Sequence, residues 1–205
     1  MAIDEAQLLT GEAVSFSKSV NLIIQVADAG LTRFAADHAM ARVGLKDQEG
    51  IGGRLHLTNY RLIFKARAAN RMHGSVSVFL PTMREVKNTS SGLKRQVDIV
   101  TDGQHFTFVV WGIAKLIAAI EAASGALTPA DTARIADLAV AAPQLVSDGL
   151  VISNGIEAVN TALTRLTHRS AAAAIAKTIG PESNSIQRAG AANLTELLEL
   201  APDAG

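Results

Sequence analysis

Apolar and polar residues alternate along the middle of the chain with the two-residue period of a β-strand. In 54–58, Leu55 and Leu57 alternate with Arg54 and His56, as in a half-buried strand. The alternation resumes over 61–67 after a short turn, so the two runs predict a hairpin. Similar runs predict further strands, and residues 14–26 also have strand character; the further strands cover 76–80, 83–88, 96–101 and 104–111.

The period changes to 3.6 residues at Gly112. Apolar residues then form one stripe that predicts a helix ending near Gly125: Ile113, Leu116, Ile117, Ile120 and Ala123,. Strands followed by one amphipathic helix predict an α+β fold, in which a curled antiparallel sheet or partly open barrel is capped by that helix. The connections are predicted to be loops or turns at 46–53, 68–74, 89–94 and 102–103, and 31–43 reads as an inserted helix,.

The last eighty residues have a helical pattern and are rich in alanine. Thr128 and Pro129 begin a helix that should run to about Ala142,. Further helices are predicted over 151–167, 170–179 and 194–200, the last begun by a capping box at Asn193, with a flexible stretch over 181–191,. We therefore divide the chain into a β domain, 1–125, and a helical region, 126–205. The helices carry few large apolar residues, so their stripes should pack on the β domain, on each other or on another copy.

The predicted hairpin carries a specific motif. Residues 52–65 read Gly-Gly-Arg-Leu-His-Leu-Thr-Asn-Tyr-Arg-Leu-Ile-Phe-Lys. This segment resembles the signature hairpin of GRAM domains, which runs Gly, x, Leu, x, Leu-Thr-Asn, x, Arg-Leu-x-Phe. The segments 76–80, 83–86 and 98–108 resemble the family's later strands in the same order, and the helix over 112–123 falls where the family has its closing helix.

The resemblance covers about residues 50–123 and implies a fold of the pleckstrin-homology type. It also implies peripheral association with membranes and phosphoinositides, or binding of proteins. The motif itself is explained by core and turn chemistry, since Leu55, Leu57, Leu62 and Phe64 point inward and Asn59 suits a turn. The inserted helix, the helical region and a histidine at position 56 depart from the family pattern.

The residue inventory argues against an enzyme. The chain has no cysteine, which removes thiolate nucleophiles and cysteine-based metal sites. Its five histidines are scattered, with His56 and His105 expected to face away from the core, and 50–53 lacks the residues of a phosphate loop,. We therefore expect a non-enzymatic protein with no cofactor and no metal. With no secretory signal and no apolar run of transmembrane length, a cytoplasmic location is expected, possibly at the membrane periphery.

Charge is uneven although the formal net charge is zero: residues 50–125 hold ten Lys and Arg against four Asp and Glu. The candidate binding residues for lipid headgroups or other anions are the basic side chains of two predicted loops, Lys65, Arg67, Arg71 and His73 in one, and Lys94 and Arg95 in the other,. Ordinary solvated charge is the alternative. Tyr60 and Trp111 are the only nearby aromatics expected to be exposed, too few to stack nucleic acid.

Two functions follow. The first is a binding module that associates with membrane headgroups through its basic loops. The second is a protein-interaction scaffold or self-associating adaptor that uses the sheet and the helical region.

Overall fold

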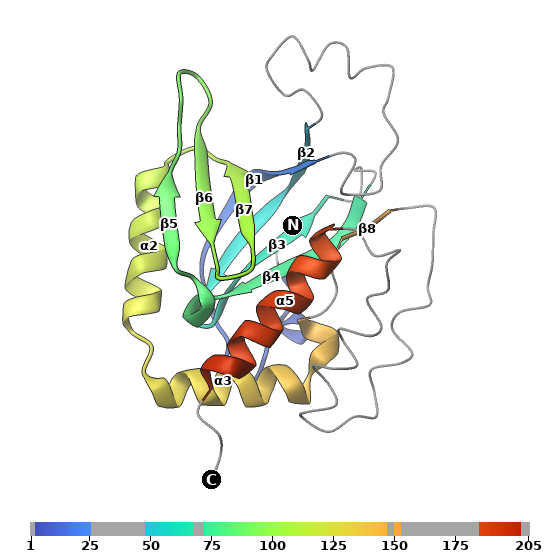
Figure 1. The fold of residues 1–205 in the computed structure, drawn as a ribbon, viewed down its shortest axis with the longest axis vertical. Helices are drawn as coiled ribbons and strands as arrows, with labels where there is room; N and C mark the ends of the chain where they lie inside the picture. Colours follow the sequence, from blue (N-terminus) through green and yellow to red (C-terminus); the bar gives the residue numbers. More distant parts are fainter. Residues whose placement is uncertain (1–2, 26–47, 68–71, 147–149, 153–184, 202–205) are drawn as a thin grey trace.

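The computed structural model describes residues 3–25, 48–67, 72–146, 150–152 and 185–201 (Figure 1). Eight strands form an antiparallel sheet in the order β5-β6-β7-β1-β2-β3-β4-β8. Their bounds are β1 (Val14–Gln25), β2 (Gln48–Thr58), β3 (Arg61–Ala66), β4 (Met72–Phe79), β5 (Glu85–Asn88), β6 (Gln96–Val100), β7 (His105–Val109) and β8 (Leu150–Ile152). The predicted α+β sheet is confirmed.

Strand β1 joins the two halves of the sheet. It pairs with β2 from Val14 to Gln25 and with β7 from Asn21 to Ile23. One side of both halves encloses the main core, which includes Leu22, Leu55, Phe64 and Phe108. Helix α2 (Ile113–Gly125) closes this core with Ile113, Leu116 and Ile120, so the predicted capping helix is also confirmed.

A second apolar cluster lies where the helical region meets the sheet. Helix α3 (Pro129–Ala141) and helix α5 (Ser185–Leu200) contact each other, and α5 also contacts β4 (Figure 1). Ile135 and Leu197 from the helices pack there with Tyr60 and Phe79 from the sheet. The short 3-10 helices are η1 (Glu5–Gln7), η2 (Leu80–Thr82) and η3 (Pro143–Leu145).

Two of the predicted loops are wrong in part. The glycine-rich segment 46–53 was expected to be irregular, but from Gln48 onward it is strand, paired to β1 with Ile51 opposite Leu22. The loop 68–74 likewise ends early, because β4 begins at Met72. In both cases pairing with a neighbouring strand overrides the low strand propensity of glycine.

The predicted helical region also needs correction. Residues 150–152 form β8, whose Val151 pairs with His73, so the predicted helix over 151–167 does not begin as a helix. Helix α5 begins at Ser185 and includes Asn193, so Asn193 is not an N-cap, and the described part of the stretch 181–191, from residue 185 onward, is helical. The predicted helix over 31–43, the predicted helix over 170–179 and Arg71 lie outside the described residues.

Among the described residues, no single helix is long and apolar enough to cross a bilayer. Helices α2 and α3 meet that length and composition only as a pair, and the pair is bent by 98°.

Candidate functional site

The outer face of the sheet, the side opposite the main core, carries a row of cations. Lys65 on β3 stands directly opposite Arg54 on β2, and Arg54 stands opposite Ser19 on β1. Directly opposed like charges destabilise a strand pair. Moreover, the Nε atom of Arg54 is buried without a hydrogen-bond partner. The row therefore places two positive charges side by side on the outer face.

The same row continues toward the other half of the sheet. The pairing of β1 with β7 ends at Asn21 and Val109, two residues before Trp111. The Lys18 side chain of β1 also reaches this part of the chain, since its Nζ lies 2.7 Å from the point where a Cβ atom of Gly112 would stand. The backbone N–H of Val110 donates to the carbonyl of Arg95 at 3.0 Å, which places the start of β6 on the far side of Trp111.

We use the name outer band for Lys65, Arg54, Ser19 and Trp111 together with the two exposed cations of the adjoining β5–β6 connection, Lys94 and Arg95, of which Arg95 stands opposite Val110. Strands in a sheet are about 4.8 Å apart, so the four steps from β3 to β6 span roughly 19 Å along the sheet. Trp111 is 73% exposed, and Lys94 and Arg95 are exposed.

The predicted binding residues fall into two groups. Lys65, Arg67 and His73 lie together near the ends of β3 and β4, where the Arg67 N–H donates to Gly52 at 3.0 Å. Lys94 and Arg95 lie in the β5–β6 connection, separated from β3 by β7, β1 and β2 (Figure 1). Lys65 is partly buried and its Nζ donates to Gln7 Oε1 at 2.7 Å.

Sequence reasoning did not select Arg54. Its position could have been found from the hairpin alone, since a turn at Asn59-Tyr60 pairs residue 54 with residue 65. The position of Trp111 near β1 could not have been found from the hairpin, because it depends on the pairing of β1 with β7.

His56 lies on the outer face, away from the main core as expected, and it is buried there. Its Nδ1 lies 2.7 Å from Ser17 Oγ, and its Nε2 is buried without a partner. Burial, followed by the nearby charges of Arg54 and Lys65, lowers the pKa of His56 from 6.5 to about 4, because the charged imidazolium is disfavoured there. The other predicted outward histidine, His105, is exposed and lies 3.0 Å from an Asp98 oxygen.

This shift makes the stability of the protein depend on pH. Between about pH 6.5 and pH 4 the unfolded chain binds a proton at His56 that the folded chain does not bind. The free energy of unfolding should therefore fall as the pH is lowered through this window. Urea titrations at several pH values should show this slope in the wild type and a flatter slope in His56→Gln. The matched control, His105→Gln, should keep the part of the slope that comes from His56. Equal slopes in the wild type and in His56→Gln would show that the pKa of His56 is not lowered by folding.

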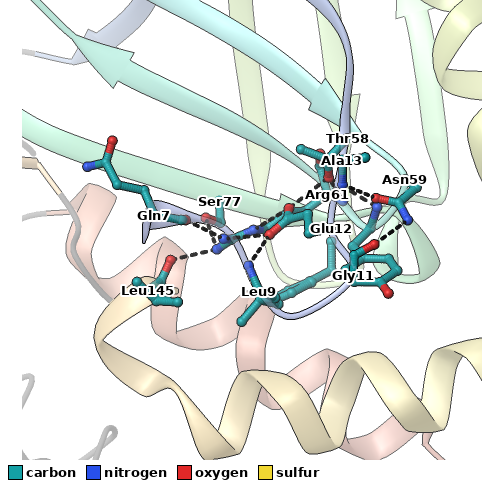
Figure 2. A network of polar contacts seen from close by, with 12 residues as sticks. Gln7, Leu9, Gly11, Glu12, Ala13, Thr58, Asn59, Arg61, Ser77 and Leu145 are labelled. Atoms are coloured by element: carbon teal, nitrogen blue, oxygen red, sulfur yellow. Dashed lines mark hydrogen bonds and ion pairs between the residues drawn. The ribbon is translucent and has the colours of Figure 1, made fainter. Parts of the chain in front are cut away.

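A second polar cluster is structural (Figure 2). The Arg61 side chain is fully buried and donates from Nε and Nη2 to the two oxygens of Glu12, at 2.9 and 3.0 Å. It also donates to Ser77 Oγ at 2.9 Å and to the Leu145 carbonyl at 2.6 Å. Every one of these partners is a group of the chain itself, so Arg61 ties the N-terminal segment and η3 to the sheet.

The turn before Arg61 belongs to the same cluster. The Thr58 hydroxyl donates to Glu12, and the Asn59 carboxamide accepts from the Ala13 N–H and donates to the Gly11 carbonyl (Figure 2). Tyr60 is buried, with Arg134 Nη2 2.8 Å from its hydroxyl. The expectation that Tyr60 is exposed is therefore wrong, because α3 packs over the turn.

Helix α5 is held to the sheet by two polar side chains. Buried Asn193 accepts from the Phe79 N–H at 2.9 Å. Glu196 accepts from the Gly103 N–H at 2.6 Å and from the Thr101 hydroxyl at 3.0 Å. These contacts fix the helical region against η2 and the β6–β7 turn.

Within the described part of the chain, no three His, Cys, Asp or Glu side chains come together as a metal site. The chemistry that the described residues offer is electrostatic, a row of cations beside an exposed indole.

Two antiparallel halves joined through β1 and closed by one helix form the α+β fold, an antiparallel sheet capped by a helix, that the sequence predicts. No family model matches the chain, and no curated protein matches it. Several solved structures are similar to it, and two of them are described here. The Vps36 N-terminal PH domain has 18% identity and a TM-score of 0.37, covering 58% of this chain and 83% of that one. The C-terminal domain of an unknown protein from Leishmania infantum has 11% identity and a TM-score of 0.39, covering 56% and 86%.

Proposed function

We propose that the chain is a non-enzymatic binding module that associates peripherally with anionic membrane lipids on the cytoplasmic side, through the basic residues of its outer face. The observation that carries this proposal is the outer band, in which Arg54 and Lys65 stand side by side on the outer face and Lys94 and Arg95 are exposed in the β5–β6 connection next to Trp111. Clustered Lys and Arg side chains attract anionic headgroups. Arg67 and His73 extend the basic area at the β3 end of the band.

We also propose that residues 50–123 are a GRAM domain. The support is that the motif residues have the roles expected of the hairpin. Leu55, Leu57, Leu62 and Phe64 are buried in the main core, and Thr58 and Asn59 fix the turn.

The alternative, a protein-interaction scaffold, has less support from the described residues. It requires an apolar helix face that is free to bind a partner. Ile135 of α3 and Leu194 and Leu197 of α5 are instead buried in the second apolar cluster.

Charge removal at one end of the band tests the proposal. Each cation near an anionic bilayer contributes about 1 kcal/mol, so Lys94→Gln with Arg95→Gln should weaken binding at least about tenfold. The measurement is co-sedimentation with vesicles of phosphatidylcholine and phosphatidylserine. Lys65→Gln with Arg67→Gln tests the other end in the same way.

The matched control is Arg84→Gln with Arg134→Gln. This double variant removes the same number of charges. The Arg84 side chain, just before β5, is 48% exposed, and that of Arg134, on α3, is 57% exposed. The control should bind vesicles as well as the wild type does. If the control loses as much binding as both band variants, only net charge matters and the assignment of the outer band is wrong.

A further inference from the structure

Two large apolar side chains are left in solvent beside the cations of the β5–β6 connection. Leu93 is 98% exposed and Trp111 is 73% exposed. The other large hydrophobic residues exposed in the described part of the chain, Val14 and Leu200, are each 38% exposed. An exposed leucine alone is unremarkable on a protein surface, but these two residues flank Lys94 and Arg95.

Leu93 sits on a tightly held turn. Ser91 and Lys94 exchange both backbone hydrogen bonds, from the Ser91 N–H to Lys94 O at 3.1 Å and from the Lys94 N–H to Ser91 O at 3.0 Å. Gly92 takes a φ of +56°, a left-handed conformation that a glycine adopts without strain,. Only Gly92 and Leu93 remain between the bridged residues, so the backbone of Leu93 is held at the tip of the turn.

The backbone around Trp111 is also fixed by neighbouring residues. Strand β7 ends before it, the Val110 N–H is bonded to Arg95, and Gly112 turns the chain into α2 with a φ of +69°. The backbone of Trp111 therefore follows directly on the bond that joins Val110 to Arg95, at the start of β6. We name Leu93, Lys94, Arg95 and Trp111 the hairpin anchor.

We infer that the hairpin anchor inserts Leu93 and Trp111 into the interfacial region of an anionic bilayer, with Lys94 and Arg95 at the headgroups. This rests on the proposed function and adds that apolar insertion, and not charge alone, holds the protein at the membrane. The chemistry is complementary at each level. Tryptophan favours the boundary between headgroups and acyl chains, a leucine side chain gains free energy on leaving water, and the two adjacent cations match anionic lipids. A protein partner would need a complementary surface of fixed shape on this chain. A protruding leucine beside an indole and two cations instead suits a lipid bilayer, whose surface is fluid.

The test uses the intrinsic fluorescence of the full chain, in which Trp111 is the only tryptophan. On adding vesicles of phosphatidylcholine and phosphatidylserine, its emission should shift to the blue, and lipids brominated on their acyl chains should quench it. Leu93→Ser should weaken the partition coefficient about tenfold or more. Leu200→Ser, a leucine exposed on α5, should leave it unchanged.

The outcomes separate the two proposals. Vesicle binding that depends on phosphatidylserine, with no blue shift and with Leu93→Ser equal to the wild type, would overturn the hairpin anchor and leave the proposed function standing. No binding to any of these vesicles would overturn both. Circular dichroism and thermal unfolding should show that both serine variants are folded, because neither side chain is buried.

Discussion

Replacing Arg61 by alanine should lower the free energy of unfolding by about 3–5 kcal/mol, because it leaves the Glu12 carboxylate buried without its partner. Both side chains of the pair are fully buried. The same substitution removes the donors to Ser77 and to the Leu145 carbonyl, so η3 also loses its attachment to the sheet. Equilibrium unfolding in urea measures the loss.

The double variant Glu12→Gln with Arg61→Met should regain part of this stability, since no uncompensated charge then remains inside. Arg84→Ala is the control, because Arg84 forms an ion pair with Asp102 whose side chains are 48% and 61% exposed, and exposed pairs contribute little. Equal small losses for Arg61→Ala and Arg84→Ala would show that the Glu12–Arg61 pair does not hold the fold together.

Gly53→Ala should destabilise the protein by about 1–3 kcal/mol or more, the usual effect of overpacking a core. A Cβ atom at residue 53 would stand 2.3 Å from Phe64 Cε2 and 2.6 Å from the Lys65 carbonyl oxygen. The ring belongs to the main core and the carbonyl to the adjacent strand, so neither can move without disturbing the sheet.

Gly50→Ala on the same strand is the matched control. Its added Cβ would meet nothing closer than 3.6 Å, which is ordinary contact, so its midpoint of thermal unfolding should stay near that of the wild type. If the two variants unfold at the same temperature, the close approach of Phe64 to Gly53 is not present in the folded protein.

The strands and closing helix could be predicted because their signals are local. The alternation of Leu55 and Leu57 with Arg54 and His56 fixes a strand whatever packs on it, and the change of period at Gly112 fixes the start of α2. The start of β2 at Gln48 could not be read in this way. Its glycines are in a strand because they pair with β1, which lies more than twenty residues earlier.

The burial of residues on the outer face could not be predicted from the sequence either. Arg61 and His56 occupy positions that alternation assigns to the exposed side of the hairpin, and Tyr60 lies in its turn. They are buried because the N-terminal segment, η3 and α3 pack over that side. A charged residue such as Arg61 gives no sign in the sequence that Glu12 neutralises it.

The sequence suggested most of the basic residues of the candidate site, but it did not predict how they are arranged in space. Lys65, Arg67, His73, Lys94 and Arg95 were selected as loop cations. Their relation to one another depends on the register of five strands, which also brings Arg54 and Trp111 into the outer band.

The most direct test of the central claim is the partition of the full chain onto vesicles in which phosphatidylserine replaces phosphatidylcholine in steps. The account predicts that the bound fraction rises with the phosphatidylserine content and falls when salt is added, because salt screens the cations of the outer band. A bound fraction that is the same with and without phosphatidylserine, or no binding at any composition, would contradict it.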